Sequence, residues 1–391
     1  MVYDFTSRTH RGGDAQKWEL MRAIAPDVGE DIVPLSVADM EFHTAPEISK
    51  GLADYVGREI LGYPAVSKSY RESVCRWAKE RHDVIIRPED IVSTPGVVSA
   101  LFTGIEAFTE PGDGVVILTP VYYPFSVAIE ETGRTMVRVP LVNEKGRYSI
   151  DEKALEESLA REDVKLMIFC NPHNPVGRVW NEEELGFVVE ACRRHGVFLI
   201  SDEIWWDLIL PGHHHTSMGR LFTAEDRGFV CTAASKSFNL AGLSTSAILF
   251  KNEEVLAAFS RMQEKSHRMN WNLLGYVGTR IAYERALPWL EELLLVLDEN
   301  RKAACAFFEE HLPEAVVSPL EGTYLLWVDL RAYEKDPLAL EKKMLASHLY
   351  LDEGYIFGEE GAGFERINLA CPKAVLLEAL LRLRNALLVE G

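Results

Sequence analysis

The chain has 391 residues, which is long enough for two domains rather than one small core. Hydrophobic residues make up 47% of it and charged residues 26%, a balance that excludes a disordered or collagen-like protein. The 41 basic and 60 acidic residues give a formal net charge of −19, so nucleic acids and anionic membrane surfaces are disfavoured as partners. An anionic ligand would therefore need a local group of hydrogen-bond donors.

The sequence favours a cytoplasmic protein. Its first twenty residues contain Asp4, Arg8, Arg11 and Asp14 and lack the apolar stretch of a signal peptide. No run of 18 apolar residues occurs, so no membrane span is expected. The six cysteines are scattered without a CxxC motif, which indicates free thiols.

Continuous apolar runs alternate with amphipathic stretches between about residues 90 and 250. An apolar stripe over residues 97–108 follows Pro95 and Gly96 and predicts a helix, and a second helix is predicted to end at Gly196. This alternation predicts a mostly parallel α/β sheet with crossover helices. The apolar runs that predict strands buried on both faces are 115–118, 164–170, 197–200, 229–234 and 247–250.

The pattern changes after residue 285 and indicates a smaller α+β domain. Here the sequence predicts a long charged helix at about 288–310, strands at 324–330 and near 366–369, and a closing helix opened by Pro372.

The N-terminal residues show little periodicity, and we expect them to pack against the smaller domain as an arm. Three parts are therefore predicted. They are an arm that belongs to the small domain (1–47), a large domain (48–287) and a C-terminal small domain (288–391).

Polar residues directly follow the predicted strands. Asn174 comes after the run at 164–170, Asp202 after 197–200, and Lys236 after 229–234. In open α/β sheets, ligands bind beyond the carboxyl ends of the strands. The sequence therefore predicts that an amide, a carboxylate and a lysine meet at one edge of the sheet.

These residue types suit pyridoxal 5′-phosphate (PLP). The aldehyde of PLP needs a lysine amine that can lose its proton, a role for Lys236. Its ring nitrogen needs an acid, a role for Asp202. Backbone N–H groups of a helix that begins at Gly96 and Val97 would bind the phosphate. The other candidates are Asn174, as a donor to the phenolic oxygen, and Tyr122, as a ring that stacks on the cofactor.

The motifs at 94–97, 174–177, 201–203 and 235–239, together with Tyr122, resemble those of the class I/II aminotransferase-fold (fold type I) PLP enzymes. Within that superfamily the chain most resembles the MalY/PatB-type carbon–sulfur β-lyases, which include cystathionine β-lyases and cysteine desulfhydrases. The resemblance runs from about residue 30 to 385 and implies a mostly parallel seven-stranded sheet in the large domain. The segments that match this branch are 38–42, 62–63, 358–361 and 363–368.

The resemblance also implies roles for individual residues. Lys236 would bind the cofactor and remove the proton from the substrate Cα. Arg366 would bind the substrate α-carboxylate in a bidentate pair, and Asp39 would also lie on the substrate side. Tyr63 would reach the phosphate bound by a neighbouring subunit, which implies a homodimer with shared active sites.

Three positions depart from the family pattern. Ala233 stands where many relatives have a phosphate-binding hydroxyl, with Thr232 and Ser235 as substitutes. Ser244 stands where aminotransferases often carry an arginine, which favours the lyase branch. Trp205 replaces a tyrosine or histidine and can only donate a hydrogen bond.

The preferred hypothesis is β-elimination from L-cystathionine or another cysteine S-conjugate, which gives a thiol, pyruvate and ammonia. The alternative is an aminotransferase reaction on L-amino acids, because both reactions use the same residues up to loss of the Cα proton. A third hypothesis is a regulatory role through a protein partner. No metal site is predicted, because the three consecutive histidines at 213–215 cannot all face one ion.

Overall fold

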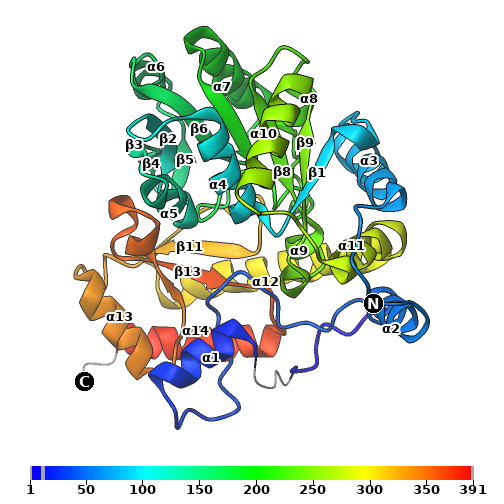
Figure 1. Cartoon of the computed structure of the whole chain (residues 1–391). Helices are drawn as coiled ribbons and strands as arrows, with labels where there is room; N and C mark the ends of the chain where they lie inside the picture. Colours follow the sequence, from blue (N-terminus) through cyan, green and yellow to red (C-terminus); the bar gives the residue numbers. More distant parts are fainter. Residues whose placement is uncertain (1, 10–13, 389–391) are drawn as a thin grey trace.

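In the computed structural model, which describes residues 2–9 and 14–388, the chain is built around two sheets (Figure 1). The larger sheet has seven strands in the order β1-β9-β8-β7-β6-β2-β3. Strand β9 is antiparallel to both neighbours, whereas β8, β7, β6, β2 and β3 pair in parallel, so the predicted sheet is confirmed. Its strands are β1 (Ile91–Thr94), β2 (Gly114–Thr119), β3 (Thr135–Pro140), β6 (Val164–Cys170), β7 (Phe198–Asp202), β8 (Gly228–Thr232) and β9 (Ser246–Phe250).

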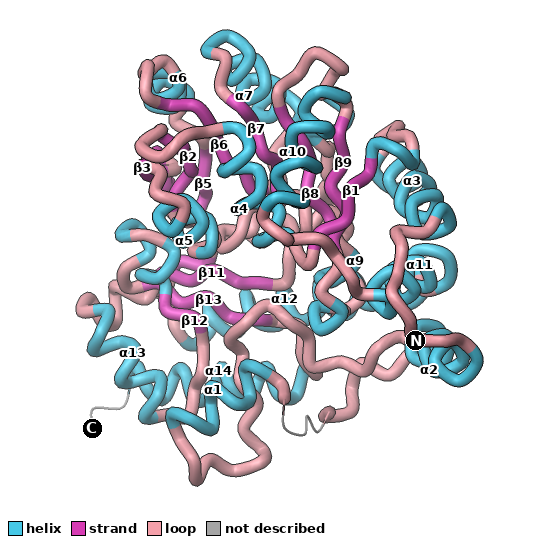
Figure 2. The backbone as a smooth tube through the Cα atoms, viewed as in Figure 1, coloured by secondary structure: helices cyan, strands magenta, loops and turns pink. Residues whose placement is uncertain are grey.

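Helices cover both faces of this sheet, and Figure 2 shows α4 and α10 in front of its strands. On that face Ile168 and Phe229 pack with apolar side chains of α4, α5 and α10. On the other face Met167 and Leu199 pack with α6 and α7. Because neighbouring strand residues point to opposite faces, such strands are continuously apolar in sequence. The helices are α4 (Val97–Phe108), α5 (Pro124–Glu131), α6 (Glu152–Leu159), α7 (Glu182–His195) and α10 (Glu253–Lys265).

Local chemistry defines the ends of α7. At its start the Asn181 side chain accepts from the backbone N–H of Glu184, and the Glu184 carboxylate accepts from the backbone N–H of Asn181, which forms a capping box. The helix ends at Gly196, whose φ of 67° lies in the left-handed region that favours glycine. The helix end predicted at this glycine is confirmed.

The smaller sheet has four antiparallel strands in the order β10-β11-β13-β12. The long charged helix, the two longer strands and the closing helix all occur close to their predicted positions. The elements are α12 (Leu287–His311), β10 (Val316–Val317), β11 (Leu325–Asp329), α13 (Pro337–Ala346), β12 (Asp352–Glu353), β13 (Phe364–Asn368) and α14 (Lys373–Leu388).

The N-terminal segment lies along the smaller sheet. The N–H of Leu35 donates to Tyr350 O, the N–H of Asn368 donates to Leu35 O, and the N–H of Glu41 donates to Ala370 O. Helix α1 (Gln16–Ile24) lies next to α14 in Figures 1 and 2. The division at residues 47 and 287 stays a prediction, and residues 1 and 10–13 of the predicted arm lie outside the described residues.

The structure differs from the sequence-based prediction in several places, of which the following concern the arm and the larger sheet. Helix α1 was not predicted; it is short and no side chain caps its N-terminus. Strands β1 and β3 were also missed, because β1 has only four residues and β3 alternates between exposed and buried positions. The strand expected over 229–234 ends at Thr232, and the four-residue helix α9 (Ala234–Ser237) follows it.

The remaining elements lie at the margins of the large sheet. None of the helices within the described ranges 2–9 and 14–388 is both long and apolar enough to cross a bilayer. The elements at the margins of the large sheet are α2 (Pro46–Arg58), α3 (Lys68–His82), the hairpin of β4 (Val142–Glu144) and β5 (Arg147–Ser149), α8 (Met218–Leu221) and α11 (Leu273–Arg285).

Candidate active site

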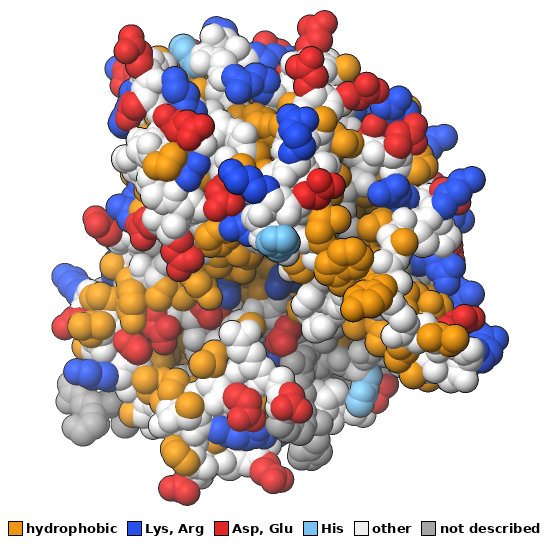
Figure 3. Space-filling view, in the orientation of Figure 1, with side chains coloured by type: hydrophobic (Ala, Val, Ile, Leu, Met, Phe, Trp, Pro, Cys, Tyr) orange, Lys and Arg blue, Asp and Glu red, His pale blue; other side chains and the backbone are white. Residues whose placement is uncertain are grey.

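A cavity of about 290 Å³ lies at the carboxyl ends of the parallel strands. Figure 3 shows a hollow on this face, between the part that holds the large sheet and the part that holds the small one. The segments that follow β1, β2, β6, β7 and β8 all contribute to the cavity wall, as the strand-end rule predicts. The sequence-predicted residues that line it are Gly96, Val97, Tyr122, Asn174, Asp202, Ser235 and Lys236.

Lys236 extends from α9 into this cavity. Its Nζ donates to the backbone oxygen of Ala38 at 2.7 Å and lies 5.4 Å from the centre of the Trp205 ring. Burial, followed by the nearby charge of Arg366, lowers the pKa of the Lys236 amine to about 8, while the carboxylates of Asp39 and Asp202 act in the opposite direction. The amine therefore loses its proton more easily than an ordinary lysine.

Asp202 ends β7 and presents a buried carboxyl group to the same cavity. Oδ1 accepts from the backbone N–H of Ile204 at 3.1 Å, and within the described part of the chain no ion pair is formed by this carboxyl. Burial raises the pKa of Asp202 to about 7, although the N–H of Ile204 and the charge of Lys236 oppose the rise. A buried carboxyl without a cation suits a cationic group of a ligand.

The N-terminus of α4 forms another part of the wall. Gly96 precedes the helix with a φ of 97°, and no side chain caps the helix. A Cβ at Gly96 would meet open space, so the glycine is required by its backbone conformation and not by crowding. The first backbone N–H groups, at Val97 and Val98, are available to an anion in the cavity.

Tyr122 and Asn174 are joined through their backbones, because the N–H of Tyr122 donates to Asn174 O at 3.0 Å. Burial raises the pKa of the Tyr122 phenol well above its usual range, so the phenol stays protonated. The Oδ1 atom of Asn174 accepts from Nη1 of Arg366 at 2.8 Å. The amide nitrogen of Asn174 is therefore left to donate to a ligand.

Arg366 does not line the cavity but lies directly behind Asn174. It comes from β13 and is buried, with its guanidinium carbon 4.6 Å from the centre of the Phe357 ring. Its Nη2 pairs with Asp352 Oδ2 at 2.6 Å, and its Nε has no hydrogen-bond partner among the described residues. Asp352 was missed by the sequence analysis, since its two-residue strand carries no recognisable pattern.

Three other predicted residues do not line the cavity. Asp39 pairs with the buried Lys17 at 2.9 Å, while its neighbour Ala38 forms part of the wall. Tyr63 has a fully exposed side chain. Thr232 is buried at the end of β8, and its Oγ1 lacks a hydrogen-bond partner among the residues described.

The three departures from the family pattern also have definite positions. Trp205 lines the cavity, and its ring packs edge-on against Tyr324 with the ring centres 4.9 Å apart. Ser244 lines the same cavity, and Thr245 next to it adds another hydroxyl. Ala233 is buried and does not line the cavity. The fold thus brings three hydroxyl-bearing residues, Ser235, Ser244 and Thr245, to the same cavity.

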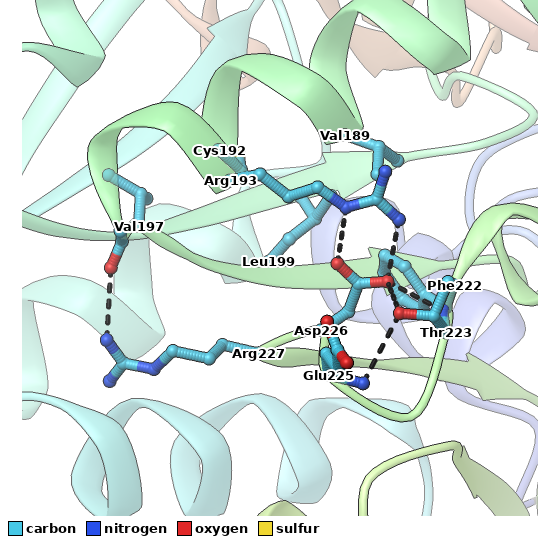
Figure 4. A pocket seen from close by; sticks show the side chains of 11 residues that line it. Val189, Cys192, Arg193, Val197, Leu199, Phe222, Thr223, Glu225, Asp226 and Arg227 are labelled. Atoms are coloured by element: carbon cyan, nitrogen blue, oxygen red, sulfur yellow. Dashed lines mark hydrogen bonds and ion pairs between the residues drawn. The ribbon is translucent and has the colours of Figure 1, made fainter.

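A larger cavity of about 430 Å³ lies at the opposite ends of the strands, beside the residues that precede β7 and β8 (Figure 4). Its buried carboxylate, Asp226, is already paired with Arg193. Asp226 accepts from Nε and Nη2 of Arg193 at 2.5 and 2.7 Å and from Oγ1 of Thr223 at 2.9 Å. The Asp226 carboxylate is therefore already satisfied within the protein.

The three consecutive histidines do not point in one direction. The side chains of His213 and His214 are exposed, whereas that of His215 is buried. Within the described residues no group of three or more His, Cys, Asp and Glu side chains is arranged to hold a metal ion.

The cavity therefore combines a lysine amine of lowered pKa, a buried carboxyl group without a cation, and an uncapped helix N-terminus. These groups fit the aldehyde, the ring nitrogen and the phosphate of PLP, respectively. Fold and site together define a fold type I PLP-dependent enzyme. The chain belongs to the aminotransferase class I and II family, whose sequence profile matches residues 30–383.

Similar proteins lie within the lyase branch. The cystathionine beta-lyase PatB of Bacillus subtilis is 38% identical over 91% of this chain and 93% of its own length. The structure of cystalysin from Treponema denticola, which contains PLP, has a TM-score of 0.96 with 42% identity and covers 99% of both chains. The PLP-bound C-S lyase from Staphylococcus hominis has a TM-score of 0.91 with 31% identity over 99% of both chains.

Proposed function

We propose that the chain is a PLP-dependent carbon–sulfur β-lyase that cleaves L-cystathionine or a related cysteine S-conjugate to a thiol, pyruvate and ammonia. The observation that carries this proposal is the shared cavity of Lys236 and Asp202, which holds an amine of lowered pKa and an unpaired buried carboxyl group. The similarity to PatB and to the C-S lyase from Staphylococcus hominis supports the choice of reaction.

Within the site, each residue has a defined task. When bound, PLP supplies an aldehyde for the substrate amine and an electron-poor ring that takes up charge from Cα. Lys236, once its amine is neutral, takes the Cα proton as a general base. Asp202 stabilises a proton on the ring nitrogen, and the first N–H groups of α4 bind the phosphate.

Other residues hold the cofactor and substrate in place. We propose that Tyr122 stacks on the ring, that Asn174 donates to the phenolic oxygen, and that Thr232 and Ser235 supply hydroxyl groups on the phosphate side. This assignment is supported by the position of Tyr122, Asn174 and Ser235 in the cavity wall and by the unpartnered Oγ1 of Thr232.

Arg366 is proposed to bind the substrate α-carboxylate. Its Nε lacks a partner, and its guanidinium is already oriented by Asn174 and Asp352. Asp39 is proposed to lie on the substrate side, where the neighbouring Ala38 lines the cavity and accepts a hydrogen bond from Lys236.

We further propose a homodimer in which Tyr63 reaches the phosphate bound by a partner subunit. Tyr63 and the nearby Ile60 and Leu61 are 100%, 91% and 57% exposed, which is unfavourable for apolar side chains in an isolated chain. The three-part division at residues 47 and 287 and a cytoplasmic location are also proposed. The six free cysteines support a reducing compartment.

The test uses purified protein reconstituted with PLP and L-cystathionine as the sole substrate, without a keto acid. We expect pyruvate, ammonia and free thiol in equal amounts. The Lys236→Ala variant should lose turnover, because no other amine in the cavity wall can act as the base. Product formation that requires an added keto acid and gives no free thiol would instead assign an aminotransferase.

A further inference from the structure

Lys236 and Asp202 lie on two different segments of the chain. Asp202 ends β7, and the loop after it continues through Asp207; Lys236 lies on α9, which follows β8. One hydrogen bond joins these segments directly, because Oγ of Ser237 donates to Oδ2 of Asp207 at 2.6 Å. The residue next to the lysine is therefore tied to the loop that follows the ring-nitrogen acid.

Asp207 is itself held firmly. Its side chain is fully buried, and Oδ1 accepts from the indole N–H of Trp77 at 3.0 Å and lies 2.8 Å from Nε2 of His82. Both of these side chains come from α3. The His82 ring in turn stacks on Trp206, with the ring centres 3.9 Å apart. The carboxylate is thus held by two side chains of α3 in addition to its bond with Ser237.

The position of helix α9 depends on its contacts with the rest of the chain. It has four residues and no side-chain N-cap, and so short a helix has no stability apart from its tertiary contacts. The Lys236 amine bonds to Ala38 O, but that bond involves the group that must move during catalysis. The bond from Ser237 to Asp207 uses no reacting atom and can persist throughout the reaction.

We propose that Asp207 and Ser237 are positioning residues that fix the Lys236 amine relative to the Asp202 carboxyl group. A general base acts only within hydrogen-bond reach of its proton, and a displacement of about 1 Å can cost on the order of 100-fold in rate. The inference rests on the proposed function in one respect, namely that the cavity binds PLP.

The experiment compares Ser237→Ala and Asp207→Asn with the wild-type holoenzyme. Asp226→Asn is the matched control, since Asp226 is also a buried carboxylate with several donors but lies at the opposite ends of the strands (Figure 4). The readouts are the pH midpoint of the visible PLP absorbance, kcat and KM for L-cystathionine, and Tm. Only the pH midpoint and the kinetic constants report on the position of the lysine, whereas Tm reports on the stability of the fold.

We expect the absorbance midpoint to move by at least about 0.5 pH unit in Ser237→Ala and Asp207→Asn, with kcat lowered about 10-fold or more and KM changed less. Asp226→Asn should lower Tm and leave the midpoint and kcat unchanged. The double variant should be no worse in kcat than the more affected single variant, because both changes act on the same bond: Ser237→Ala deletes it and Asp207→Asn replaces its carboxylate acceptor by an amide.

The outcomes separate the two proposals. If the wild-type protein develops no visible band with PLP, the proposed function fails. If the wild-type band forms normally but Ser237→Ala and Asp207→Asn behave like Asp226→Asn, the positioning role is wrong. Ser237→Ala removes a single hydroxyl group, so its result decides the question even if Asp207→Asn does not fold.

Discussion

Nη1 of Arg366 donates to Oδ1 of Asn174 at 2.8 Å, which links the smaller sheet to the wall of the cavity. Arg366 comes from β13, whereas Asn174 follows β6 of the larger sheet. The bond uses the oxygen of Asn174 and leaves its amide nitrogen for the cofactor. The proposed substrate-binding arginine and a proposed cofactor-binding amide therefore orient one another.

The first prediction concerns Arg366→Lys. Lysine keeps the positive charge but loses the planar fork that can bind both Asn174 and a carboxylate. Hydrogen bonds to charged groups contribute about 1.5–3 kcal/mol, so KM for L-cystathionine should rise about 10- to 100-fold. Steady-state kinetics would measure this. The control is Arg331→Lys, at an exposed arginine that is paired with Asp329, and it should leave KM unchanged. An unchanged KM in Arg366→Lys would rule out the proposed contact between Arg366 and the substrate carboxylate.

The second prediction concerns the lowered pKa of Lys236. In the cofactor-free protein the amine titrates at about 8, so its neutral fraction rises steeply between pH 7 and 9. Only the neutral amine attacks an aldehyde. The rate of PLP incorporation, followed by visible absorbance, should therefore rise only about 10-fold from pH 7 to 9 and then level off, whereas the rate for a lysine peptide of ordinary pKa should rise about 100-fold over the same window. A rate ratio that stays constant with pH would contradict the lowered pKa.

The main site residues could be predicted because each directly follows a buried apolar strand. Asn174 and Lys236 come after β6 and β8, Asp202 ends β7, and parallel strands carry their carboxyl ends to one edge. The local sequence thus predicted the strands, and the parallel topology of such sheets predicted that the residues at their carboxyl ends lie close together. The N-terminus of α4 was predictable from Gly96 for the same reason.

The supporting residues could not be predicted, since their partners are set by tertiary pairing. Asp352 meets Arg366 because the two lie opposite each other in the register between β12 and β13. Asp207, in the loop after β7, meets Ser237 on α9, and a side chain of α3 also contacts Asp207. Neither pairing has a spacing or pattern in sequence. Two strands of the larger sheet could not be predicted either, because β1 is short and ends in polar residues and β3 alternates between exposed and buried positions.

The third prediction concerns Asp202→Asn. Burial raises the pKa of Asp202 to about 7, so the folded protein without cofactor holds this proton more tightly than the unfolded chain. The carboxyl group therefore costs stability increasingly as pH rises from about 4 to 7. Without PLP, Asp202→Asn should have a higher Tm than the wild-type protein at pH 8 and a similar Tm at pH 4.

The same substitution should lower activity when PLP is present. A neutral amide cannot stabilise a proton on the ring nitrogen as a carboxylate does, so kcat should fall on the order of 100-fold or more. The opposite signs of the two effects, in Tm without cofactor and in kcat with it, distinguish a functional carboxyl group from a structural one. A wild-type kcat in Asp202→Asn would refute the assigned role.

The fourth prediction concerns Glu353 and Glu365, which lie opposite each other on β12 and β13. Burial raises the pKa of Glu353 to about 7 and that of Glu365 well above its usual range, and the neighbouring carboxylates add to both effects. Deprotonation of Glu353 in the folded state is therefore unfavourable, and stability should fall as pH rises from about 4.5 to 7.

Glu353→Gln removes this ionisation and should raise Tm at pH 8 by about 1 °C for each kcal/mol of cost relieved, with a much smaller change at pH 4.5. Differential scanning calorimetry at the two pH values measures the difference. The control is Glu309→Gln, at an exposed position on α12, which should change Tm equally little at both. An equal gain at both pH values would show that packing, and not the buried charge, accounts for the effect.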